Sequence, residues 1–307
     1  MSPDGSRITA NMYLKVFKNY LCLFETAKMT LLRSYGPYTW ELNKVSMSYD
    51  GKYIAAADAF SALYLFNGVD GSTIWYTDPQ SISFFDWVGI SSDGNYIWTS
   101  GWGGAGDFVI LFGRSSSTPL WSKEVSESGA ICATSVEGNV FAMWDSVYSN
   151  LTVFDRTGTL LWQKCLSGPH SITVSSNGSY IGVGGGWYRR KITLFDKSGE
   201  SIISQIGDCV AISDDGKTFA ALSHCRLCAL DTNSSAILWT YHFPNALSTV
   251  AVSANGDYTF AGGLNGIIYL FNRRMPLWNY STGDSITSVA ISSSGDYMVA
   301  TDALGRL

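Results

Sequence analysis

A repeat of about 40 residues runs through the whole chain, and this period restricts the fold more than any other feature of the sequence. Each copy begins with an apolar stretch that ends in serine, such as VGIS at 88–91 and VAIS at 210–213, followed by a polar turn closed by glycine. Asp-Gly, Asn-Gly and Ser-Gly pairs favour a tight turn with a positive φ. The turn glycines are Gly5, Gly51, Gly94, Gly138, Gly178, Gly216, Gly256 and Gly295.

A second apolar stretch follows in each of the first seven copies, for example LYLF at 63–66 and IYLF at 268–271. Asn or Asp usually comes next, a residue type that opens turns by bonding its own backbone. The stretch after that turn carries a tryptophan in five copies, and LLRSY at 31–35 and IISQ at 202–205 replace it in the other two. The five tryptophans are Trp75, Trp121, Trp162, Trp239 and Trp278.

Four short strands per repeat, separated by turns, predict the blade of an all-β propeller. Helical repeats need an apolar period of about 3.6 residues, which is absent here, and leucine-rich repeats are shorter. We expect one domain over 1–307 with seven four-stranded antiparallel blades; eight blades with the last one incomplete is the alternative. The five tryptophans are expected to pack between adjacent blades. The predicted repeats lie near 1–40, 41–83, 84–127, 128–167, 168–206, 207–245, 246–285 and, as a partial copy, 286–307.

Together, VAIS, the DG turn, YLF and LW resemble the repeats of the quinoprotein-like and WD40-like β-propeller proteins of bacteria and archaea. The LW pair is closer to tryptophan-docking repeats than to WD40 proper, whose Gly-His and Trp-Asp pairs are missing. The resemblance covers essentially the whole chain. It implies the fold but not the activity, because propellers carry many unrelated functions.

The composition excludes several functions. Charged residues make up 15% of the chain and the net charge is −5, which argues against nucleic acid as a partner. No apolar run is long enough to cross a membrane as a helix. Four Asn-x-Ser/Thr sequons, at Asn150, Asn177, Asn233 and Asn279, favour a location outside the cytoplasm, and six scattered cysteines favour the opposite. The compartment stays open, as does the interpretation that the chain is a fragment of a longer anchored or secreted protein.

No constellation of residues predicts catalysis. His170, His224 and His242 fall in different predicted loops, without the spacing of a metal site. Cys225 and Cys228 form a lone C-x-x-C, for which we weigh buried free thiols against a local disulfide. The resemblance to quinoproteins would imply a quinone and a calcium ion held by Glu, Asn and Asp, with a pair of adjacent cysteines, but no such set matches. We therefore expect no metal, no cofactor and no enzymatic activity.

Aromatic residues are concentrated in the predicted loops between second and third strands, beside arginine. Exposed aromatics next to arginine are typical of protein-binding hot spots, although the same rings could pack over the loops. Two functions follow: a protein-interaction scaffold that binds through these loops or, as the alternative, a small-molecule or glycan site, enzymatic or not, at the mouth of the central channel. The predicted partner-binding residues are Phe60, Trp102, Trp187, Tyr188, Arg189 and Arg190. The links between blades add Phe84, Phe85, Trp87, His170, His242 and Phe243.

Overall fold

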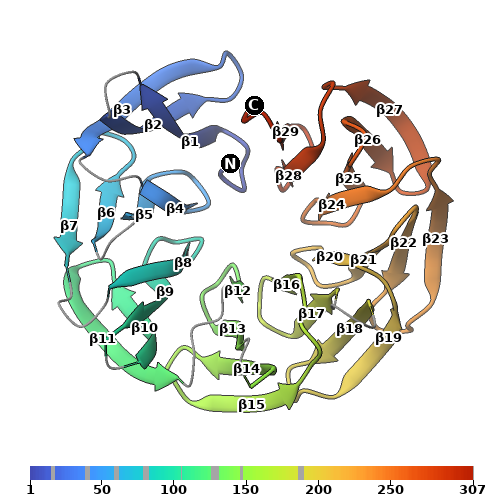
Figure 1. The fold of residues 1–307 in the computed structure, drawn as a ribbon, viewed down its shortest axis with the longest axis horizontal. Coiled ribbons are helices and arrows are strands. Elements are labelled where there is room, and N and C mark those ends of the chain that lie inside the picture. The colour runs from blue at the N-terminus through green and yellow to red at the C-terminus, as the bar shows by residue number, and fades with distance from the viewer. Residues whose placement is uncertain are drawn as a thin grey trace. The chain divides into compact units, whose positions relative to one another are not determined.

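The computed structural model describes residues 1–14, 18–38, 42–58, 62–78, 83–104, 106–125, 131–145, 148–185 and 190–306. Within these ranges it contains strands and turns, and no helix there could cross a membrane. The strands form eight sheets, A to H in chain order. The chain divides into two compact units, Met1–Cys165 with sheets A to D and Leu166–Leu307 with sheets E to H (Figure 1).

The first unit holds one sheet of three strands and three sheets of four. Sheet A consists of β1 (Arg7–Leu14), β2 (Lys18–Glu25) and β3 (Thr30–Tyr38). Sheet B consists of β4 (Leu42–Met47), β5 (Tyr53–Asp58), β6 (Leu63–Asn67) and β7 (Thr73–Thr77). Sheet C consists of β8 (Phe84–Ile90), β9 (Tyr96–Gly103), β10 (Gly106–Gly113) and β11 (Ser116–Val125). Sheet D consists of β12 (Ile131–Thr134), β13 (Val140–Asp145), β14 (Asn150–Asp155) and β15 (Leu160–Cys165).

The second unit holds three sheets of four strands and one of two. Sheet E consists of β16 (Ser171–Val174), β17 (Tyr180–Gly184), β18 (Lys191–Asp196) and β19 (Ser201–Ile206). Sheet F consists of β20 (Cys209–Ile212), β21 (Thr218–Ser223), β22 (Arg226–Asp231) and β23 (Ile237–His242). Sheet G consists of β24 (Leu247–Val252), β25 (Tyr258–Gly263), β26 (Ile267–Asn272) and β27 (Met275–Ser281). Sheet H consists of β28 (Ile286–Ile291) and β29 (Met298–Asp302).

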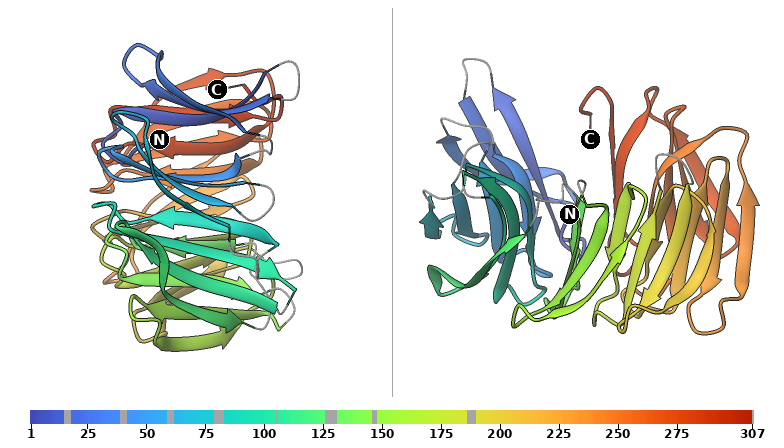
Figure 2. Two further views of the ribbon diagram at one scale, coloured as in Figure 1. Left: turned by 90° about the vertical axis from the view of Figure 1, so that its left-hand side faces the viewer. Right: turned by 60° about the horizontal axis from the view of Figure 1, so that its bottom comes forward.

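The predicted four-stranded repeat is confirmed in sheets B to G, whose strands pair in chain order as antiparallel neighbours. Sheet A corresponds to the second, third and fourth strands of a repeat, and sheet H to the first and second. These described sheets are compatible with both seven and eight blades. Within each unit the successive sheets pack against one another, as the views in Figure 2 show.

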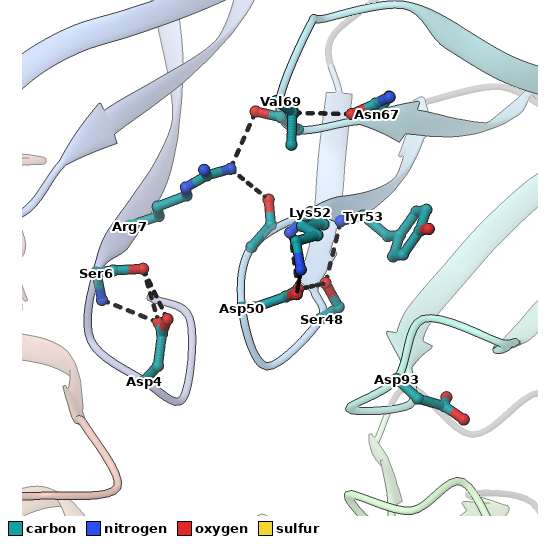
Figure 3. A network of polar contacts seen from close by, with 12 residues as sticks. Asp4, Ser6, Arg7, Ser48, Asp50, Lys52, Tyr53, Asn67, Val69 and Asp93 are labelled. Carbon is teal, nitrogen blue, oxygen red and sulfur yellow. Dashed lines mark hydrogen bonds and ion pairs between the residues drawn. The ribbon is translucent and has the colours of Figure 1, made fainter.

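The turn between the first two strands has the same construction throughout. Gly94 and Gly256 adopt φ values of 70° and 74°, and the other predicted turn glycines are also left-handed, which confirms the predicted turns. In sheet B the Ser48 hydroxyl accepts a hydrogen bond from the Tyr53 amide at 3.0 Å and donates to Asp50 at 3.1 Å (Figure 3). Arg7 of sheet A donates through Nη1 to the carbonyl oxygen of Gly51 at 2.9 Å, and this bond ties sheet A to the turn of sheet B. The turn of sheet B is therefore fixed by its own side chains and by the preceding sheet.

Large side chains fill the space between neighbouring sheets. Every residue of β13 is buried, as expected for an inner strand that contributes side chains to the core on both of its faces. Trp75 of sheet B donates its indole N–H to the carbonyl oxygen of Arg114 in sheet C at 2.9 Å, and Trp121 makes the same bond to Arg156 in sheet D. Trp162 and Trp239 are also buried.

Trp278 differs from the other repeat tryptophans. It is 40% exposed, and all seven residues of its strand β27 are exposed. The next sheet, H, has only two described strands, so the third strand on which such a tryptophan packs elsewhere is not among the described residues. The burial of a repeat tryptophan thus depends on the outer half of the following sheet.

Candidate functional site

Each sheet has two distinct ends. The turn end carries the turn glycines, and the loop end carries the connections between second and third strands together with the links from one sheet to the next. Loops on a rigid scaffold are where propellers and similar folds place binding residues. The predicted partner-binding residues belong, by their position in the repeat, to the loop end.

In the first unit two aromatic side chains project from the loop end. Trp102 is 54% exposed, and its backbone is held within sheet C, where it pairs with Phe84 of β8 and Asp107 of β10. Tyr148 is 59% exposed and donates its amide to the Oδ1 atom of Asp145 at 3.0 Å. Asp145 is itself buried at the end of β13. Both rings are therefore exposed on backbone that the blade holds in place, which keeps the entropic cost of binding low.

In the second unit the loop end combines charge with aliphatic side chains. The Nε atom of Arg190 lies 3.5 Å from Oδ1 of Asp208, whose Oδ2 accepts the amide of His224 at 3.0 Å. This ion pair is exposed, so it contributes little stability but does orient the guanidinium. Leu264 and Leu304, in the loops that follow β25 and β29, are more than half exposed.

The two leucines were missed by the sequence analysis, which considered aromatic residues and arginine. Their position in the repeat could have indicated that they are exposed. Like Phe60 in the sequence, each leucine comes one or two residues after a second strand. An apolar residue that lies in such a loop and has no strand to pack on is left in solvent, whether or not it is aromatic.

Four of the six predicted partner-binding residues, Phe60, Trp187, Tyr188 and Arg189, lie outside the described residues. The remaining two, Trp102 and Arg190, belong to different units. The predicted surface is therefore described as two separate loop ends.

Three aromatic residues expected in exposed links between blades lie in the core instead. Phe85 is fully buried between sheets B and C, and Phe243 is buried between sheets F and G. The Trp87 ring packs on Phe141 of sheet D at 5.5 Å. Of the two alternatives, exposure or packing, these three rings follow the second. Phe85 and Trp87 lie in β8, which begins at Phe84, so that side chains alternate between its two faces. Phe243 lies in the link between β23 and β24, where it packs on Tyr269 and Phe271.

The possible disulfide between Cys225 and Cys228 is not formed. All six cysteines are free thiols in the structure. Cys228 is buried in β22, where its Sγ atom lies 3.4 Å from the Thr240 hydroxyl, whereas Cys225 lies in the tight turn before that strand. The register of the hairpin assigns the Cys228 side chain a place in the core, which corrects the disulfide interpretation.

Carboxylates at both ends of the sheets take part in turns. Asp196 accepts hydrogen bonds from the hydroxyl and the amide of Ser198, at 2.6 and 2.9 Å, and these bonds lower the pKa of its carboxyl group. Asp58 accepts the amide of Ala62 in the same manner at the loop end. Within the described ranges no three His, Cys, Asp or Glu side chains converge in a way that could hold a metal ion.

A cavity of about 320 Å³ lies along the first strands of the first unit. Its lining includes Thr9, Ser46, Met47 and Ser92, and no carboxylate or histidine side chain belongs to it. The surroundings offer hydroxyl groups and apolar atoms but no acid–base pair.

Comparison with known proteins shows the fold. No protein-family model and no curated protein sequence matches the chain. Among solved structures, BamB from Moraxella catarrhalis is similar over 98% of this chain and 96% of its own, with 13% identity and a TM-score of 0.68. Sqt1 from Chaetomium thermophilum, solved bound to the N-terminus of ribosomal protein L10, matches over 96% and 90%, with 14% identity and a TM-score of 0.74.

A third similar structure is the β-propeller domain of Cps50 (Swd1) from Myceliophteria thermophila. It has 12% identity and a TM-score of 0.60, over 86% of this chain and 91% of its own. The chain therefore has a WD40-like β-propeller fold.

Proposed function

We propose that the protein is a non-catalytic scaffold that binds another protein through the loop ends of its blades. The observation that carries this proposal is the exposure of Trp102 and Tyr148 on backbone that hydrogen bonds hold in place. Exposed apolar rings at fixed positions are unfavourable in water and are the usual anchors of protein interfaces. In the sequence, Trp187, Tyr188, Arg189 and Arg190 come between the residues of β17 and β18, and they are residues of the same binding type.

Two further observations support an interaction role. Leu264 and Leu304 add exposed apolar surface at the loop end of the second unit. Among the similar structures, Sqt1 is solved in complex with a peptide segment of another protein, so a fold of this type can present such a surface. The carboxylates that could otherwise suggest catalysis, such as Asp58 and Asp145, bond to the backbone of their own loops.

The test replaces surface rings without touching the core. A photo-crosslinking amino acid at position 102 would first identify the partner in cells. With that partner purified, Trp102→Ala combined with Tyr148→Ala should weaken binding by at least about 2 kcal/mol, the scale of a hot spot. Tyr76→Ala is the matched control, because Tyr76 is an equally exposed ring of the same unit but lies on the outer strand β7.

Equal affinities for the double variant and the control would contradict the proposal. A loss of folding stability above about 1 kcal/mol in the double variant would show instead that the rings are part of the packing.

A further inference from the structure

Within each unit, the first residue of a second strand packs onto the turn glycine of the following described sheet. The ring of Tyr53 in sheet B lies directly against Gly94 in sheet C, and Tyr180 and Tyr258 lie in the same way against Gly216 and Gly295. Tyrosine is thus the usual residue at this position of the repeat, and its ring closes the space between two sheets at the turn end. The residues at this position are Arg7, Tyr53, Tyr96, Val140, Tyr180, Thr218, Tyr258 and Tyr297.

In two of the repeats, an arginine from the following sheet covers this tyrosine ring. The guanidinium carbon of Arg114 lies 4.8 Å from the ring centroid of Tyr53, and that of Arg156 lies 4.1 Å from the ring centroid of Tyr96. Both distances are those of cation–π contacts. Arg114 donates its amide to the carbonyl oxygen of Asn95, in the turn of its own sheet, at 3.0 Å.

Arg273 of sheet G occupies the same place in the repeat, but no aromatic ring of the described residues lies beneath it. Its amide donates to the carbonyl oxygen of Asp257, the bond that Arg114 makes to Asn95. The preceding sheet presents Thr218 in place of the tyrosine, and this small side chain lies against the turn glycine Gly256. The replacement removes a six-membered ring from the space between sheets F and G.

A cavity of about 570 Å³ opens at this point. Thr218, Gly256 and Arg273 line it, together with Trp239 and Leu238 of the outer strand β23. Pockets of about 300–1,000 Å³ are of the size that binds organic ligands. All lining residues belong to sheets F and G, which are neighbours within the second unit (Figure 1).

The polar groups around the cavity favour an anionic group on the ligand. Arg273 pairs with Asp257 at 3.2 Å and Lys217 with Asp215 at 3.4 Å. Arg274 also lines the cavity, and no carboxylate within the described ranges lies in salt-bridge distance of it. One positive charge at the cavity is therefore left without a counter-charge in that part of the chain.

The indole N–H of Trp239 is a further hydrogen-bond donor at the cavity. Trp75 and Trp121 donate their indole N–H groups to the carbonyl oxygens of Arg114 and Arg156. Trp239 stacks on Phe271 at 5.7 Å but has no hydrogen-bond acceptor for its indole among the described residues. A ligand with an oxygen acceptor can satisfy this donor.

We propose that this cavity binds an aromatic side chain of a partner protein, with an acidic residue next to it in the partner sequence. The ring takes the place that Tyr53 and Tyr96 occupy elsewhere, beneath the guanidinium of Arg273, and the neighbouring carboxylate pairs with Arg274. A peptide segment suits the site because exposed apolar side chains continue from it along β23: Leu238 lines the cavity, and both Leu238 and its neighbour Ile237 are more than half exposed. The site lies at the turn end, so its occupancy does not depend on the loop-end surface.

The test uses a fluorescein-labelled peptide of sequence Ser-Asp-Tyr-Asp-Ser and measures its anisotropy with the full chain. Thr218→Tyr restores the ring of the repeat and should weaken binding at least about ten-fold by filling the cavity, while raising the melting temperature through the contact with Arg273. Thr218→Val is the matched control, because it exchanges the hydroxyl for a methyl group and adds no ring to the cavity, and it should bind within about two-fold of the native chain. Arg274→Ala should weaken binding about five-fold, and only for peptides that carry the carboxylates.

Several results would overturn the proposal. One is undiminished binding to a Thr218→Tyr variant whose melting temperature has risen, since the ring then fills a cavity that the peptide does not use. If Thr218→Tyr does not fold, undiminished binding to Arg273→Ala and Arg274→Ala overturns it equally. Free 4-hydroxyphenylacetate that competes as well as the peptide would assign the site to a small aromatic acid. A concentration-dependent dimer that Thr218→Tyr abolishes would assign it to a second copy of this chain.

Discussion

The energetic role of the repeat tryptophans can be tested by comparing two that differ in one respect. Trp239 and Trp278 occupy equivalent places in sheets F and G, but Trp239 is 9% exposed and Trp278 is 40% exposed. Trp239 stacks on Phe271 of the following sheet at 5.7 Å with its ring plane within 20°. The nearest ring to Trp278 is Phe260 of its own sheet, at 6.2 Å.

The difference in burial sets the expected difference in stability. It amounts to about a third of a residue surface of roughly 200 Å². At about 25 cal/mol per Å² this corresponds to about 1.5 kcal/mol, and the stacking on Phe271 adds about 0.5–1.5 kcal/mol. Since truncating a buried tryptophan costs about 3–5 kcal/mol, we expect about 4 kcal/mol for Trp239→Ala and about 2 kcal/mol for Trp278→Ala.

Urea denaturation followed by far-UV circular dichroism measures both values. Trp162→Ala serves as the control, because Trp162 is buried to the same extent as Trp239 and should cost as much. If Trp278→Ala destabilises the protein as strongly as Trp239→Ala, then Trp278 is buried in solution and the two described strands of sheet H are not its whole surroundings.

Three further predictions concern thiols, turns and titration. The unfolded, unreduced protein should react with six equivalents of a thiol reagent. In the folded protein at pH 8, the exposed Cys165 should react first. Cys132 should not react at all, because burial raises the pKa of its thiol to about 12. A count of four would restore a disulfide. Gly94→Ala should cost at least about 2 kcal/mol, because it forces a left-handed alanine against Tyr53, and a cost near zero would refute that turn. The pKa of Asp196 lies below its ordinary value because Ser198 donates to it, so its contribution to stability is present above the unfolded-state pKa and is lost as the pH falls through the folded-state pKa. Ser198→Ala should raise that pKa in an NMR titration, and an unchanged value would contradict the assignment.

The sequence was sufficient for the repeat and its turns. A glycine that needs a positive φ and a short apolar strand beside it are local signals, so the positions of Gly94 and Gly256 and the strands around them could be predicted. Contacts between repeats are harder to predict from the sequence. The contact between Tyr53 and Arg114 joins residues in different sheets. The sequence shows Thr218 in the tyrosine position, but only the structure shows which contact is lost there.

The burial of side chains at the ends of strands could not be predicted from the sequence either. Phe85 was expected in an exposed link but lies in the core, because one residue decides which face of a strand a side chain joins. Leu264 and Leu304 were overlooked because a leucine is ordinarily a core residue, and only the structure shows that these two side chains are more than half exposed.

The most direct test of the scaffold function is the affinity of a purified partner for the Trp102→Ala, Tyr148→Ala double variant, measured by titration calorimetry beside Tyr76→Ala. The account predicts that the double variant binds at least about 30-fold more weakly than the native chain, the equivalent of about 2 kcal/mol, while the control binds as the native chain does. Native affinity in the double variant, with the fold intact, would show that the loop end of the first unit is not where the partner binds.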